Sequence, residues 1–170
     1  VYLPQSIGPL EGPAGLICRK ALESIDRIYL RDDESMAELA MPNVRRCADL
    51  AVLKLARDLE RLEVMNGSAG RMVVVPRDLP RAGRLHDGLA QLRALSPDAL
   101  WAVQADVEGP RSDAAFCERL GVSAAGPLAQ VLEQPDAGVV VSVRLHGAIG
   151  AMLAGHPAIH LAYERKGRGA

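Results

Sequence analysis

Basic and aromatic side chains gather near the end of the chain in a pattern that suits the binding of a small anion. Arg144 and His146 follow one apolar run, and Tyr163 and Lys166 follow the next. A guanidinium group binds phosphate or carboxylate through two parallel hydrogen bonds. An imidazole at a helix N-terminus can bind phosphate, or it can transfer a proton near neutral pH. These residue types predict an anion site and leave both roles of His146 open.

Two strands and a helix between them must position these side chains. Residues 138–143 are apolar and rich in β-branched side chains, which predicts a strand buried on both faces of a parallel sheet. Residues 146–154 predict a short helix closed by a turn at 155–157, and residues 158–162 predict the next strand. Ligands of open α/β sheets bind beyond the carboxyl ends of the strands. The predicted anion site has that location.

The second half of the chain alternates regularly between strand and helix patterns. Strands alternating with short helices predict βαβ units around one parallel sheet. Right-handed crossovers then predict the strand order 3-2-1-4-5. The expected strands are 72–75, 99–103, 122–124, 138–143 and 158–162, and the expected helices are 85–95, 112–120, 128–134 and 146–154.

This strand order predicts where further binding residues lie. It makes the strand at 72–75 a neighbour of the strand at 138–143, so that Arg77 faces Arg144 across the crevice between them. Gln104 follows the strand at 99–103 and therefore ends on the same edge. Alternatively, Arg144 could pair with an acidic neighbour while His146 caps its helix.

Residues 1–68 predict part of another α/β domain, and residues 69–170 form the second, with the boundary at the linker-like segment 66–70. Gln5 and Ser6 lie at the carboxyl end of the first strand. Because the chain begins on Val1 inside a strand pattern, we expect the N-terminal domain to be incomplete. The expected strands here are 1–5, 27–30 and 43–47, and the expected helices are 13–24, 32–40 and 50–64, the second capped by Asp32 or Asp33.

The composition excludes several classes of protein. The 170 residues are 49% hydrophobic with a net charge of −1, which is typical of a globular protein and argues against a nucleic-acid partner. Arg144 interrupts the best apolar stretch, so no transmembrane segment is expected. Cys18, Cys47 and Cys117 lack disulfide or metal spacing and predict reduced thiols in the cytoplasm. The remaining histidines lack metal-ligand spacing, so we expect no metal.

The segment Val143-Arg-Leu-His-Gly147, followed by Gly155-x-Pro157 and Tyr163-x-x-Lys166, resembles the polysaccharide pyruvyl transferases. Gln5-Ser-x-Gly-Pro9 and Arg31-Asp-x-x-Ser35 resemble the same family less specifically. The resemblance implies a Rossmann-like fold in a two-domain, glycosyltransferase-like architecture. It also implies a transferase of polysaccharide biosynthesis that is located in the cytoplasm, where a peripheral position at the inner face of the membrane is one option. No counterpart of the family's upstream glycine-rich segment is found.

The activity implied by the resemblance is transfer of a pyruvyl group from phosphoenolpyruvate to a sugar, which forms a pyruvate ketal. The donor is a substrate and no cofactor is implied; the acceptor is a saccharide or a lipid-linked saccharide of the cell envelope or of an exopolysaccharide. Arg144 and His146 are then the catalytic candidates. The substrate-binding candidates are Arg77, Lys166, Tyr163, Gln104, Gln5 and Ser6, and Asp106 or Glu108 could deprotonate the acceptor hydroxyl.

Two other functions fit the same sequence. A glycosyltransferase of similar two-domain fold would use a nucleotide sugar, although the chain offers few aromatic residues for stacking on a base. A non-catalytic sugar-binding or assembly domain is the alternative from another class. A homo-oligomer is left open by all three readings.

Overall fold

The computed structural model describes residues 1–52, 70–80, 83–105, 109 and 111–163. These residues gather into two compact units, residues 1–52 and the described residues from 70 to 163, and each is considered by itself. Both are α/β, with parallel strands flanked by helices, which confirms the predicted α/β, Rossmann-like class. The glycosyltransferase-like two-domain architecture stays a prediction. The predicted domain boundary at residues 68–69 lies outside the described residues.

The first unit is built on a three-stranded parallel sheet. Its order is β1 (Tyr2–Gln5), β2 (Ile28–Leu30) and β3 (Val44–Arg46), and its helices are α1 (Gly12–Glu23) and α2 (Asp33–Glu38). Asp32 caps α2 as predicted, because its Oδ1 accepts a hydrogen bond from the Ser35 N–H at 2.7 Å. Of the helix predicted at 50–64, residues 50–52 are helical and the rest lie outside the described residues.

The second unit contains a five-stranded parallel sheet in the order β6-β5-β4-β7-β8. In chain order this is 3-2-1-4-5, so the predicted topology is confirmed. Its strands are β4 (Arg71–Val75), β5 (Leu100–Val103), β6 (Ala124–Pro127), β7 (Ala137–Ser142) and β8 (Ala158–His160), and its helices are α4 (Gly83–Leu95), α5 (Asp113–Arg119), α6 (Leu128–Leu132) and α7 (Leu145–Leu153).

Strand β6 begins at Ala124, two residues later than the predicted start at Val122. The Val122 N–H donates to the Cys117 carbonyl at 3.0 Å, and Gly121 has a φ of 70°. Val122 therefore belongs to the turn that ends α5 and not to the strand. This turn needs a residue in the left-handed conformation, which Gly121 adopts easily. The apolar character of Val122 reflects packing against the α5 side of the core rather than strand pairing.

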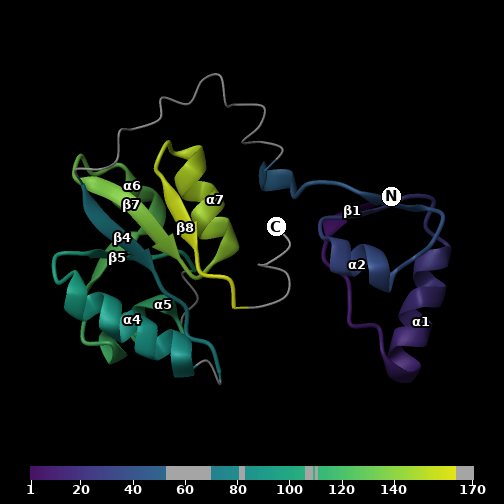
Figure 1. Cartoon of the computed structure of the whole chain (residues 1–170), viewed down its shortest axis with the longest axis horizontal. Coiled ribbons are helices and arrows are strands. Elements are labelled where there is room, and N and C mark those ends of the chain that lie inside the picture. Colours follow the sequence, from purple (N-terminus) through teal and green to yellow (C-terminus); the bar gives the residue numbers. More distant parts are fainter. Residues whose placement is uncertain (53–69, 81–82, 106–108, 110, 164–170) are drawn as a thin grey trace. The chain divides into compact units, whose positions relative to one another are not determined.

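Alternate residues of the second sheet enter two separate cores. Val73, Val75 and Val140 pack with residues of α6 and α7, whereas Val74 and Trp101 pack with residues of α4 and α5. Figure 1 shows these two helix pairs on opposite faces of the sheet. The alternation follows from the two-residue repeat of a strand. Burial on both faces explains why residues 138–143 are mostly valine, with Ser142 as their one polar side chain.

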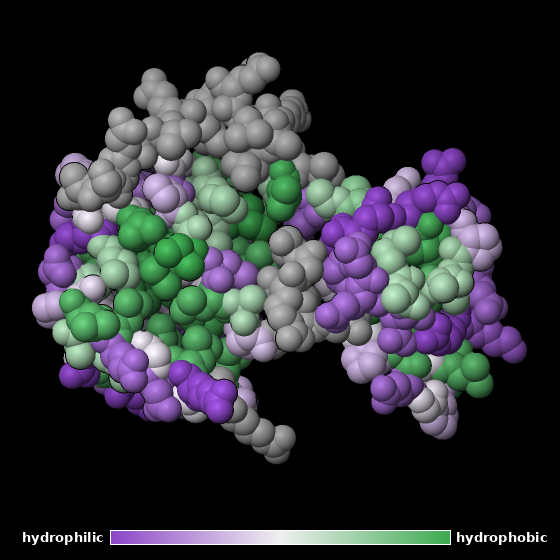
Figure 2. All heavy atoms as spheres, viewed as in Figure 1, coloured by the Kyte–Doolittle hydropathy of each residue, from purple (hydrophilic) through white to green (hydrophobic). Residues whose placement is uncertain are grey.

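The surfaces of both units mix hydrophilic and hydrophobic residues, as Figure 2 shows for one face. On α1, Leu16 and Ile17 are 68% and 70% exposed, so this helix presents apolar side chains outward. None of the helices in the described part of the chain combines the length and the apolar character that crossing a membrane requires.

Candidate functional site at the carboxyl edge of the second sheet

Arg144 is held by a buried aspartate that joins three parts of the second unit. Asp113, the first residue of α5, is fully buried; its Oδ2 accepts from Arg144 Nε at 3.1 Å and its Oδ1 accepts from Arg144 Nη2 at 2.7 Å. Oδ2 also accepts the backbone N–H groups of Gln104 at 3.2 Å and Ala105 at 3.0 Å. Asp113 thus fastens the ends of β5 and β7 to the start of α5.

This ion pair confirms the alternative in which Arg144 pairs with an acidic neighbour, and it leaves part of the guanidinium for other partners. A guanidinium carries five N–H groups, and the bonds to Asp113 use its Nε edge. The Arg144 side chain is 22% exposed. The pairing therefore fixes one edge of a planar fork whose other edge keeps its donors.

The α7 N-terminus follows directly from Arg144. Arg144 is the N-cap residue, with extended backbone at φ −96° and ψ 124°, and its side chain makes no capping hydrogen bond. The expectation that His146 caps this helix is wrong, because His146 lies within the first turn. Ser142 stabilises the entry, since its hydroxyl donates to the Arg144 carbonyl at 2.7 Å and accepts the Arg144 N–H at 3.1 Å. His146 is consequently presented at the carboxyl edge of the sheet.

Arg77 lies in the loop next to Arg144, as the strand order predicts. Val75 pairs with Ser142 across β4 and β7, and each arginine lies two residues beyond that pair. The Arg77 guanidinium donates to the Tyr163 hydroxyl and lies 5.6 Å from the centroid of the Tyr163 ring. Two substrate-binding candidates therefore contact each other, while Lys166 lies outside the described residues, as do Asp106 and Glu108.

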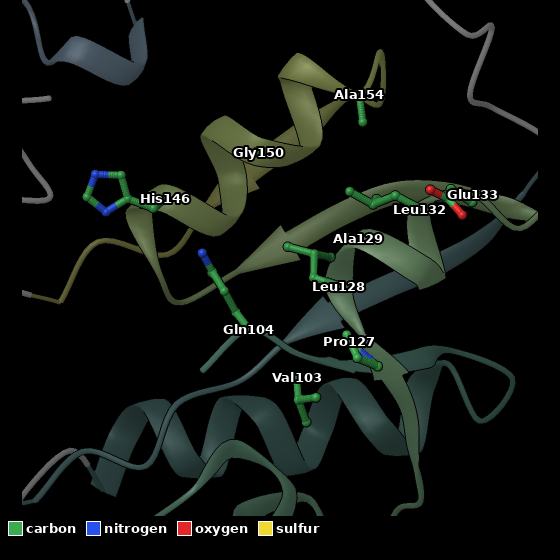
Figure 3. Close-up of a pocket in the computed structure, with 10 residues that line it drawn as sticks. All are labelled: Val103, Gln104, Pro127, Leu128, Ala129, Leu132, Glu133, His146, Gly150 and Ala154. Carbon is green, nitrogen blue, oxygen red and sulfur yellow. The ribbon is translucent and has the colours of Figure 1, made fainter. Parts of the chain in front are cut away.

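A pocket of about 540 Å³ lies between α6 and α7. In Figure 3, Leu128 and Ala129 extend from α6 toward α7, and Gln104 reaches from the end of β5 toward the first turn of α7. Gln104 and His146 mark one end of the pocket, and Glu133 and Ala154 mark the other. The complete lining is Val103, Gln104, Pro127, Leu128, Ala129, Leu132, Glu133, His146, Gly150 and Ala154.

The predicted site residues of the second unit therefore divide into two groups. Gln104 and His146 line the pocket, whereas Arg77, Arg144 and Tyr163 are not among its described lining residues. Tyr163 instead packs against the core that lies beneath α4 and α5. His146 lies two positions after Arg144 in the sequence and also lines the pocket. It therefore lies where the pocket meets the loops that carry Arg77 and Arg144.

Gly147 allows the end of β5 to approach α7 closely. A Cβ atom at this position would lie 2.5 Å from Ser142 Oγ and closer still to Gln104 Oε1. Real Cβ atoms do not approach other heavy atoms so closely, so only glycine fits here without a shift. Gln104 Oε1 is buried and has no hydrogen-bond partner among the described residues.

Gln5 and Ser6 belong to the first unit, at the end of β1. Gln5 Oε1 accepts from the Tyr2 hydroxyl at 3.4 Å, and Ser6 Oγ accepts from Arg31 Nε at 3.0 Å. Arg31 also forms an ion pair with Asp49, and both line a second, smaller pocket of about 260 Å³. The resemblance places Gln5 and Ser6 at the substrate, and that assignment stays a prediction.

The buried histidine and cysteine of the second unit have structural surroundings. His156 is 2% exposed, and its Nε2 lies 2.9 Å from the Leu132 carbonyl and its Nδ1 3.2 Å from the Gly138 carbonyl. Burial, reinforced by the negative charge of Asp113, raises the pKa of the Cys117 thiol to about 11. Cys117 therefore stays protonated at neutral pH and does not serve as a nucleophile. No metal-binding group of three such side chains occurs within the described ranges.

Sequence reasoning missed Asp113, Glu133 and Gly150. Asp113 follows Ser112 at a predicted helix start, where an aspartate is common for reasons of helix electrostatics alone. Its pairing with a residue 31 positions away depends on how β5, α5 and β7 pack. Glu133 and Gly150 carry no local signal, because only the packing of α6 beside α7 makes them neighbours of one pocket.

Comparisons with protein-family models, curated proteins and solved structures gave no match. The fold and site define an α/β, Rossmann-like protein with a ligand-sized pocket between α6 and α7, one end of which lies at the carboxyl edge of its sheet. An arginine held on one side, an imidazole and a helix N-terminus meet beside that pocket. Such groups can bind an anion and transfer a proton.

Proposed function

We propose that this protein transfers a pyruvyl group from phosphoenolpyruvate to a pair of hydroxyl groups on a cell-envelope or exopolysaccharide sugar. The observation that carries the proposal is Arg144, which Asp113 holds by one edge at the N-terminus of α7, two residues before His146. The motifs at 143–147 and 163–166 resemble those of the pyruvyl transferases and support the choice of donor. Position at the carboxyl edge of a parallel sheet agrees with a ligand site.

Phosphoenolpyruvate carries a phosphate and a carboxylate, and both are hydrogen-bond acceptors. In the proposed complex, the outer edge of Arg144 and the N–H groups that begin α7 bind one of these anions. Arg77 lies in the adjacent loop and binds the other, with Tyr163 holding its guanidinium. Lys166 adds a positive charge for the phosphate. Asp113 holds the planar Arg144 guanidinium in one orientation, which lowers the entropy lost on binding.

The proposed chemistry is an addition to the enol phosphate of phosphoenolpyruvate, followed by loss of phosphate. C3 of phosphoenolpyruvate takes a proton, and the oxygen of one sugar hydroxyl attacks C2 and loses its own proton. The bond between C2 and the bridging oxygen breaks, and inorganic phosphate leaves. The second hydroxyl then attacks C2, loses its proton and closes the ketal. Of the two protons that the hydroxyls release, one balances the proton given to C3 and the other goes to the departing phosphate. His146 either gives the proton to C3 or binds the departing phosphate.

Replacing Arg144 by lysine tests the proposal, because lysine keeps the charge and loses the fork. We expect Arg144→Lys to lower turnover by about 10²–10³, as when one donor that stabilises developing charge is removed. The measurement is phosphate release from phosphoenolpyruvate in the presence of saccharide acceptors, with mass spectrometry of the acceptor. Arg84→Lys, on the exposed side of α4, is the matched control and should retain full turnover.

A thermal melt accompanies each variant and separates loss of function from loss of folding. Wild-type turnover in Arg144→Lys, or an activity loss that only follows unfolding, would remove the anion-binding role. Calorimetry with a nucleotide sugar tests the rival glycosyltransferase. Tight binding of the nucleotide sugar without any response to phosphoenolpyruvate would overturn the pyruvyl transferase proposal, and binding of neither would favour a non-catalytic domain.

A further inference from the structure

Gly150 leaves an open space in the middle of α7. A Cβ atom at this position would meet no atom within 4 Å, and Gly150 lines the pocket between α6 and α7. Glycine destabilises the interior of a helix relative to alanine. Packing explains Gly147, whose Cβ would collide with Ser142 and Gln104, but it does not explain Gly150. The glycine at 150 instead widens the pocket at the expense of helix stability.

The lining of this pocket is complementary to a ligand without negative charge. Its polar residues are Gln104, Glu133 and His146, the other lining residues are aliphatic, glycine or proline, and neither lysine nor arginine occurs among those described. The Glu133 carboxylate, when ionised, only accepts hydrogen bonds. A neutral ligand that donates hydrogen bonds therefore fits this lining better than phosphoenolpyruvate, whose ionised phosphate and carboxylate only accept them.

We propose that the pocket between α6 and α7 binds the acceptor sugar, and that Gly150 determines how large a ring it admits. This inference rests on the proposed function for the identity of the ligand. Sugar hydroxyls donate to the Glu133 carboxylate, and the C–H face of the ring packs on Leu128 and Leu132. From His146 to Ala154 the pocket follows α7 for about 12 Å, at 1.5 Å per residue. One ring with part of the next saccharide unit fills that length.

The position of His146 connects the acceptor to the donor. His146 lines the end of the pocket and lies two residues after Arg144, to which the proposed function assigns the donor. A sugar seated between Gln104 and Glu133 directs its nearest hydroxyls toward that end. The loops that carry Arg77 and Arg144 then bind the anionic donor, and the pocket, whose described lining contains no lysine or arginine, binds the neutral acceptor.

Filling the pocket at Gly150 tests the proposal without removing any hydrogen bond. Gly150→Leu places its side chain in the open space, so the protein should fold and its melting temperature should not fall. Gly88→Leu is the matched control, because Gly88 also lies inside a helix, is exposed and would meet no atom within 4 Å. Saturation-transfer NMR with the methyl glycosides of glucose, galactose and mannose measures binding directly, without reference to catalysis.

We expect at least one methyl glycoside to give a signal with the wild type and with Gly88→Leu, and Gly150→Leu to weaken its binding at least about tenfold. Unchanged signals in Gly150→Leu would overturn the proposal, and so would the absence of signals from all three glycosides. Binding of uridine that Gly150→Leu abolishes would overturn it in favour of a nucleotide. If the wild type binds a glycoside but never releases phosphate from phosphoenolpyruvate, the proposed function fails while the sugar pocket stands.

Discussion

In both units an arginine follows a strand and forms an ion pair with an aspartate. The two hydrogen-bond networks differ in which residue makes most of the hydrogen bonds. In the first unit Arg31 is the centre: its Nε donates to Ser6 and its Nη1 donates to Asp49. In the second unit Asp113 is the centre and receives four donors, two from Arg144 and one each from the backbone of Gln104 and Ala105. The arginine distributes its donors in one case and concentrates them on one carboxylate in the other.

This difference indicates what each arginine can still do. Arg31 spends its Nε and Nη1 on two separate partners that follow β1 and β3, so it joins the ends of the three strands. Arg144 donates through Nε and Nη2 to one buried partner, Asp113, and the donors on its other edge remain beside the α7 N-terminus. Arg31 is therefore suited to holding strands together, and Arg144 is suited to holding a ligand.

Removing the charge of Asp113 should have the largest effect on folding. Asp113→Asn leaves Arg144 without its counter-charge and turns one acceptor oxygen into a donor that faces other donors. We expect the free energy of unfolding of the second unit to fall by about 3–5 kcal/mol, as when one partner of a buried ion pair is removed. Hydrogen-exchange mass spectrometry under native conditions reports this unit separately from the first.

The control for Asp113→Asn is Asp87→Asn, on the exposed side of α4. Equal exchange protection in the two variants would contradict the central role of Asp113. A rise in anion affinity in Asp113→Asn, measured with inorganic phosphate, would show that Asp113 competes with the ligand rather than positioning Arg144.

Removing the charge of Asp49 should have a smaller effect, confined to the first unit. Asp49 accepts from Arg31 and from the Ala51 N–H at 3.0 Å, and Arg31 keeps its hydrogen bond to Ser6 in the variant. Asp49→Asn should therefore cost about 1–3 kcal/mol, which is typical of losing a hydrogen bond to a charged group. Hydrogen exchange of β2 and β3 measures the loss, and a cost equal to that of Asp113→Asn would abolish the contrast between the two networks.

The local pattern predicted the elements of the second sheet well, because its signals are strong and mutually consistent. Residues 138–143 are almost entirely apolar, which indicates that both faces of the strand are covered, and the right-handed crossover rule then predicts the neighbours of β7. The same rule predicted that the loops with Arg77 and Arg144 are adjacent, which the pairing of Val75 with Ser142 confirms. Element boundaries were less accurate where a turn carries apolar residues, as at Val122.

The partners of the site residues could not be predicted in the same way. The sequence indicates that Arg144 ends a strand, but Asp113 reaches it only because α5 packs against the neighbouring strands β5 and β6. The pairing of Arg77 with Tyr163 joins residues 86 positions apart. Periodicity reports which face of an element is buried, and it carries no information on which polar groups meet across elements.

An exposed ion pair in the second unit gives the smallest expected effect and calibrates the others. Arg71 Nε lies 2.8 Å from Asp136 Oδ2, and the two side chains are 39% and 50% exposed. The distance resembles the 2.7 Å between Arg144 and Asp113, but solvent screens the exposed charges. A double-mutant cycle with Arg71→Ala and Asp136→Ala, followed by urea unfolding, should give a coupling energy of about 0.2–1 kcal/mol that decreases with added salt. A coupling energy as large as the loss of unfolding free energy in Asp113→Asn would mean that burial does not distinguish the Arg144–Asp113 pair from an exposed pair. The role of Asp113 in holding Arg144 in place would then have no energetic support.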